Sequence, residues 1–158
     1  MKKLKISDHA KIPGPLYKII KLYCEEENWF RKIHRIIDAF EWSIKWHTVL
    51  TLSDLLGDIP DAMKYELSEK LATPSLGIWY GWHLQALNGL KDPVVDWKGW
   101  DTLVAAENEN GIIALRNKLA HGATPSEDQC QKECENFLPV LLDLISSPFF
   151  PNFFVINN

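Results

Sequence analysis

Apolar residues recur at helical spacing along most of the chain, and Gly and Pro interrupt that pattern at intervals. The stretch from Glu26 to Leu56 contains neither Gly nor Pro. Its apolar residues alternate at three- and four-residue spacing, which is typical of one buried helix face. The main stripe consists of Phe30, Ile33, Ile37, Phe40 and Ile44, and a second strip beside it of Trp29, Ile36 and Leu50. We therefore predict one long central helix with neighbours on two sides.

Shorter helices are predicted around this central one. They cover residues 14–26, 58–72, 73–87 and 101–121 and a final segment that begins near residue 124. Asn88-Gly89 and Asp92-Pro93 mark residues 88–100 as a loop, and Gly122 is placed to end the helix over 101–121. No run of alternating strand residues occurs. The predicted fold class is therefore all-α, a bundle of five to six helices with one long central helix.

The final helix has a clear start signal. Thr124-Pro125-Ser126-Glu127 reads as a capping box with Pro in the first turn. The buried stripe predicted after it is Cys130, Cys134, Phe137, Leu138, Leu141, Leu142 and Ile145. Because both cysteines lie on this stripe, we interpret them as buried structural thiols rather than as half of a metal site.

The two ends of the chain differ from its helical body. Residues 1–21 contain six lysines and one acid, a charge of +5, so the rest must carry −9 to reach the total of −4. We therefore divide the chain into a basic N-terminal arm (1–13), a helical domain (14–147) and an apolar tail (148–158). Two prolines interrupt the tail. Two alternatives are open for the tail: it folds back onto the helices, or it is the start of a further domain of a longer chain.

Composition narrows the function classes. With 46% hydrophobic and 24% charged residues, the chain is globular rather than disordered or fibrous. A sequence pI near 5.7 excludes nucleic-acid binding through bulk positive charge. No apolar run reaches the about 18 residues of a membrane span, and no signal-peptide pattern follows the first lysines. With three cysteines, reduced thiols and a cytoplasmic location are expected.

One polar cluster carries candidate chemistry. Arg116, Asn117 and His121 close a predicted helix just before Gly122, and Asn117 and His121 share a helix face. An imidazole can move protons near pH 7, while a guanidinium can bind phosphate oxygens and stabilise charge in a transition state. This trio suits RNA cleavage without a metal or cofactor, more credibly in a two-fold dimer. A plainer reading also stands, in which Arg116 and His121 merely complement the helix C-terminus.

Residues upstream could support this cluster. Glu109 lies seven residues before Arg116 on nearly the same face and could pair with its guanidinium. Asn110 shares the face of Asn117 and His121. Other histidines are weaker candidates. His47 continues the buried stripe of the central helix, His83 flanks two tryptophans and is expected to pack, and His34 is expected to be solvated.

The string Leu115-Arg116-Asn117-x-Leu119-Ala120-His121-Gly122 resembles the Arg-x4–6-His motif of HEPN domains. The resemblance rests on residues 113–122 and, by helix order alone, on 14–147. It implies an all-helical homodimer whose motifs face each other, with Arg116, Asn117 and His121 as the catalytic set of a metal-independent endoribonuclease. The product would carry a 2′,3′-cyclic phosphate. HEPN toxins paired with nucleotidyltransferase antitoxins carry Tyr two residues after the His, where this chain has Ala123.

Two functions of different classes follow. The first is an HEPN-like endoribonuclease of a toxin or antiviral defence system, with RNA as substrate and an antitoxin or further domain as a partner. The second is a non-catalytic helical dimerisation or sensing domain at the N-terminus of a larger regulatory protein. The apolar tail favours the second slightly.

Overall fold

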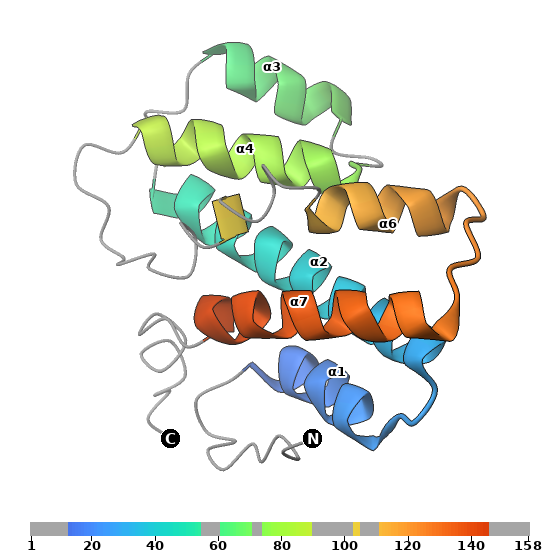
Figure 1. Ribbon diagram of the computed structural model, residues 1–158. Coiled ribbons are helices and arrows are strands. Elements are labelled where there is room, and N and C mark those ends of the chain that lie inside the picture. Colours follow the sequence, from blue (N-terminus) through green and yellow to red (C-terminus); the bar gives the residue numbers. More distant parts are fainter. Residues whose placement is uncertain (1–12, 55–60, 71–73, 90–102, 105–110, 146–158) are drawn as a thin grey trace, which may run out of the picture. The chain divides into compact units, whose positions relative to one another are not determined.

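The computed structural model describes residues 13–54, 61–70, 74–89, 103–104 and 111–145 (Figure 1). All regular secondary structure in these ranges is helical, which confirms the all-α fold class. The helices are α1 (Gly14–Glu25), α2 (Trp29–Asp54), α3 (Asp61–Lys70), α4 (Leu76–Gly89), α6 (Ile112–Ala120) and α7 (Glu127–Ile145). Residues 90–100 of the loop predicted over 88–100, residues 1–12 of the basic arm and the whole tail (148–158) lie outside the described residues.

The long helix α2 begins three residues later than predicted. Asn28 caps it, because the side-chain oxygen of Asn28 accepts a hydrogen bond of 3.0 Å from the backbone N–H of Arg31. The predicted stripe is buried from Ile33 onward, but Phe30 was wrongly included and is 40% exposed. Its ring packs edge-on against the exposed His34, with centroids 4.9 Å apart. The core face of α2 therefore starts one turn inside the helix.

The helices fall into two compact units. The first unit draws on Met1–Phe40 and Val95–Asn158 and contains α1, the start of α2, α6 and α7. In its core the rings of Phe40 and Phe137 meet edge to face, with centroids 6.0 Å apart. The predicted stripe of α7 is confirmed at Cys130, Cys134, Phe137, Leu141 and Ile145. This unit carries the candidate site.

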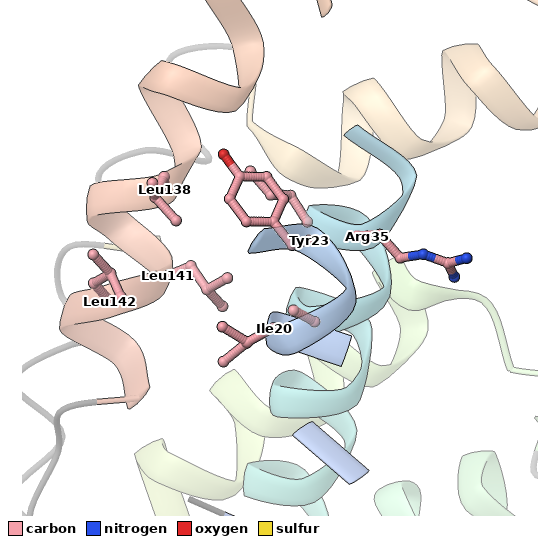
Figure 2. A pocket seen from close by; sticks show the side chains of 8 residues that line it. Ile20, Tyr23, Arg35, Leu138, Leu141 and Leu142 are labelled. Atoms are coloured by element: carbon pink, nitrogen blue, oxygen red, sulfur yellow. The ribbon is translucent and has the colours of Figure 1, made fainter. Parts of the chain in front are cut away.

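A small apolar cavity lies between α1, α2 and α7 (Figure 2). Ile20 and Tyr23 of α1 face Leu138, Leu141 and Leu142 of α7 there. Arg35 also borders the cavity, but Figure 2 shows its guanidinium directed away from these leucines. The volume is only about 10 Å³, the lower limit for one water molecule. The cavity is therefore a packing gap and not a ligand pocket.

The second unit, Glu41–Val94, contains the rest of α2 with α3 and α4. Trp82 and Ala86 form its buried centre, and the hydrophobic residues packed against them are Leu52, Leu67, Ile78 and Trp79. Thr48 of α2 places its hydroxyl 3.1 Å from the carbonyl oxygen of Trp79 in α4. That contact fixes α4 against α2 within the unit.

Several predicted helix boundaries are corrected. The segment predicted as one helix over 101–121 is interrupted at Gly111, whose extended backbone precedes the first turn of α6. Only residues 103–104 are described before that break, and they are helical. α4 continues through Asn88 and Gly89, so that pair is not a loop. The predicted helix over 58–72 is described only as α3, Asp61–Lys70.

The capping box of α7 also differs from the predicted one. Ser126 and Gln129 form it reciprocally: Ser126 Oγ accepts from the backbone N–H of Gln129 at 3.3 Å, and Gln129 Oε1 accepts from that of Ser126 at 2.9 Å. Thr124 and Glu127 do not form the box. Further along, Pro139 lies inside α7 on its exposed side. Its missing N–H costs the helix one hydrogen bond, at a place where water can replace it.

Candidate functional site

The backbone at the end of α6 closes in a defined way. His121 is the C-cap residue, and Gly122 follows with a positive φ of 85°. The N–H of Gly122 donates to the carbonyl of Leu119 at 3.1 Å, and that of Ala123 to the carbonyl of Lys118 at 3.0 Å. These two bonds are the Schellman closure, and the left-handed residue they require is most easily Gly. Gly122 therefore ends α6 as predicted.

The predicted trio lies along the last turn of α6 and at its cap. Asn117 and His121 are exposed, and Arg116 is half-buried. The Nη1 group of Arg116 is 3.5 Å from Oδ1 of Asn117, the upper limit of a hydrogen bond. The opposite face of α6 has three apolar residues, which we expect from helical spacing to pack on the core. Ile112 is fully buried, whereas Leu115 and Leu119 are only half-buried.

The helix that carries the trio has basic residues and no acidic ones. α6 has the sequence IIALRNKLA and contains no acidic residue. Neither Arg116 nor Lys118 forms an ion pair with a carboxylate among the described residues. The predicted supporting residues, Glu109 and Asn110, lie outside the described ranges. Chemically, a guanidinium, an amide and an imidazole together can bind an anion such as a phosphate diester, and an imidazole can transfer protons to and from hydroxyl groups.

The histidines away from α6 divide as predicted. His34 is exposed, whereas His47 and His83 are completely buried in the Glu41–Val94 unit. Their rings lie with centroids 6.3 Å apart, and Thr51 Oγ1 is 3.4 Å from Nδ1 of His83. Burial lowers the pKa of each of these two imidazoles to about 3, and for His83 the neighbouring His47 lowers the pKa further. They are neutral core residues and not proton-transfer groups of a surface site.

The cysteines show no sign of metal chemistry. Cys130 and Cys134 are buried as free thiols, and burial raises the pKa of Cys134 to about 12. Both are therefore inert, protonated thiols at neutral pH. In the described part of the chain, no three His, Cys, Asp or Glu side chains gather as a metal site would require. None of the described helices is long and apolar enough to cross a membrane.

Sequence reasoning missed one charged residue in the core. Lys32 of α2 is only 9% exposed. Its Nζ lies 4.6 Å from the ring centre of Trp29 and 5.3 Å from that of Tyr23. Two aromatic faces thus receive the ammonium group as cation–π partners. In the sequence, burial of Lys32 could have been inferred from its position beside Ile33 and one turn after Trp29, at the edge of the buried stripe.

Comparison of the chain with protein-family models, with curated proteins and with solved structures found no match.

Proposed function

We propose that the protein is an HEPN-like, metal-independent endoribonuclease. One observation carries the proposal: Arg116, Asn117 and His121 lie together at the exposed end of α6, on a helix without acidic residues. A surface with a fixed positive charge and an imidazole suits an anionic substrate whose cleavage needs proton transfer. The resemblance of this string to the HEPN motif supports RNA as that substrate. We place the activity in the cytoplasm, in a toxin or antiviral system.

The reaction divides between the three side chains. The 2′-hydroxyl of one nucleotide attacks the adjacent phosphorus, and His121 as base takes the hydroxyl proton. Arg116 binds the non-bridging phosphate oxygens and stabilises the charge that develops on them. The bond from phosphorus to the 5′ oxygen breaks, and an imidazolium donates a proton to that oxygen. Asn117 orients Arg116, whose guanidinium it already approaches at 3.5 Å. The products are a 2′,3′-cyclic phosphate and a 5′-hydroxyl end.

The proposal includes a homodimer. In an in-line displacement the attacking hydroxyl and the leaving 5′ oxygen lie on opposite sides of the phosphorus, so two copies of His121 can supply a base on one side and an acid on the other. The exposure of the trio in a single copy also favours a dimer. Charged groups stabilise a transition state best where water is excluded, and a second copy facing the first would exclude it. A two-fold axis through facing α6 ends satisfies both requirements.

The exposed position of the trio also favours one alternative. A non-catalytic helical dimerisation or sensing domain would use Arg116 and His121 to complement the C-terminus of α6. Such a domain would need neither a cleft nor a substrate. The two functions differ in whether RNA is cleaved, so a direct assay separates them.

The test incubates purified protein with single-stranded RNA in excess EDTA. Arg116→Ala and His121→Ala are compared with Arg31→Ala and His34→Ala, which change exposed residues of the same types on α2. We expect cleavage by wild type and both α2 variants, and none by the two α6 variants. Mass spectrometry of the products should show 2′,3′-cyclic ends. Uncleaved RNA with every protein would refute the nuclease and favour the binding domain.

A further inference from the structure

Asn117 and His121 form a ridge on the solvent-facing side of α6, and a cation flanks this ridge on each side. At 100° per residue, the two ridge residues lie near the middle of that side. Arg116 lies at one edge of that side and Lys118 at the opposite edge, about 200° around the helix from Arg116. Arg116 is half-buried and Lys118 is exposed. The ridge therefore has a positive group on each side, and the proposed reaction gives a role only to the group on the Arg116 side.

The charge of Lys118 is not neutralised by a nearby carboxylate, whereas five other cations are paired. The ion pairs among the described residues include Lys21–Glu25 (3.7 Å), Arg31–Glu26 (3.9 Å), Arg35–Asp38 (3.3 Å), Lys45–Glu41 (2.6 Å) and Lys64–Asp61 (3.0 Å). Lys118 has no carboxylate partner among the described residues. An acidic protein thus keeps uncompensated positive charge beside His121.

The closure of α6 fixes Lys118 relative to His121. The carbonyl of Lys118 accepts from Ala123 at 3.0 Å, and the N–H of His121 donates to the carbonyl of Asn117 at 3.0 Å. The backbones of both residues therefore belong to the same hydrogen-bonded turn. A strand that lays one phosphate between Arg116 and His121 and continues across the ridge reaches Lys118 next.

We propose that Lys118 binds a second phosphate of the same RNA strand. The inference rests on the proposed function and sharpens its substrate class: single-stranded RNA with a phosphate beside the one that is cleaved, so at least a trinucleotide. Lys118 acts as a point charge on phosphate oxygens and takes no part in proton transfer. It contributes to binding and to the salt dependence of binding, because contact with a phosphate releases a counterion.

The test measures binding separately from cleavage. A fluorescent, fully 2′-O-methylated 12-mer, which lacks the attacking hydroxyl, is titrated with protein between 50 and 200 mM KCl. For Lys118→Gln we expect the slope of log K against log salt to be less steep by about 0.7, the value for one phosphate contact on a single strand. Over this fourfold change in salt, wild type should lose about 2.6-fold more affinity than the variant. Lys118→Arg should restore the slope.

The matched control is Lys132→Gln, which removes an exposed lysine from α7. Equal slopes for wild type, Lys118→Gln and Lys132→Gln would overturn the inference, even if Lys118→Gln lowers the melting temperature through its place in the last turn of α6. Absence of both binding and cleavage by wild type would overturn the proposed function together with the inference. Binding that depends on Lys118 without cleavage of normal RNA would refute the nuclease alone.

Discussion

The buried pair His47 and His83 predicts acid sensitivity of the Glu41–Val94 unit. Both rings are fully buried, and the pKa of each is lowered from 6.5 to about 3 because burial disfavours the charged form. In the unfolded chain both imidazoles return to their ordinary pKa. Between these two pKa values the unfolded state binds more protons than the folded state. The contribution of the two neutral histidines to stability is therefore fully present above pH 6.5 and is lost as the pH falls toward 3.

The magnitude follows from the size of the shift. Each pH unit within the interval costs about 1.36 kcal/mol per histidine. From pH 7 to pH 5, one histidine removes about 1.9 kcal/mol of unfolding free energy and the pair about 3.8 kcal/mol. Domains of this kind have a total stability of about 5–15 kcal/mol. The pair alone should therefore remove a large fraction of the stability by pH 5.

The assay is urea unfolding followed by circular dichroism at pH 7, 6 and 5. His47→Gln and His83→Gln remove one titrating group each while keeping a polar side chain, and His34→Gln changes an exposed histidine as the matched control. We expect each buried variant to lose about 1.9 kcal/mol less than wild type between pH 7 and pH 5, whatever its stability at pH 7. The control should behave as wild type does. The reasoning is wrong if all four proteins show the same pH dependence.

Three further predictions concern the ends of α6 and α7 and the thiols. Gly122→Ala should destabilise the protein by about 1 kcal/mol in urea unfolding, because φ is +85° while the space around a new Cβ is open; Gly122→Asn should cost less. Ser126→Ala should cost about 1 kcal/mol through loss of the cap, and unchanged stability would contradict the observed capping box. A thiol reagent at pH 8 should label the half-buried Cys24 before Cys134, and an equal rate for both would refute the burial of Cys134.

The parts of the fold that sequence predicted best are those with long periodic stripes. In α2 and α7 most apolar positions indicate the same face, so Ile37, Phe40 or Cys134 could be placed in the core without knowing the partner helix. The ends of the helices were harder to predict. The stretch before α7 contains two overlapping capping frames, one from Thr124 and one from Ser126, and local pattern cannot rank them. The break at Gly111 was missed because a single Gly is tolerated inside many helices.

The site shows the same division between local and non-local information. The place of Arg116, Asn117 and His121 at the end of a helix followed from spacing and from Gly122, which are local properties. The exposure of these side chains could not be predicted from spacing, because it depends on how deeply Leu115 and Leu119 are buried against other helices. Lys32 is the clearest non-local case. A lysine is seldom buried, and beside Trp29 of its own helix this one needs the approach of Tyr23 from α1, which the pattern of α2 alone does not predict.

The distribution of ion pairs gives an acidic protein a local way to bind RNA under the proposed function. Where Lys45 or Arg35 is paired with a carboxylate one turn away, its field largely cancels at a distance. Arg116 and Lys118 lack such partners among the described residues, so their two charges act together at the end of α6. With so few contacts, affinity should be modest and sensitive to salt. Dimer formation would then control both chemistry and binding, because each copy alone offers one imidazole and two phosphate ligands.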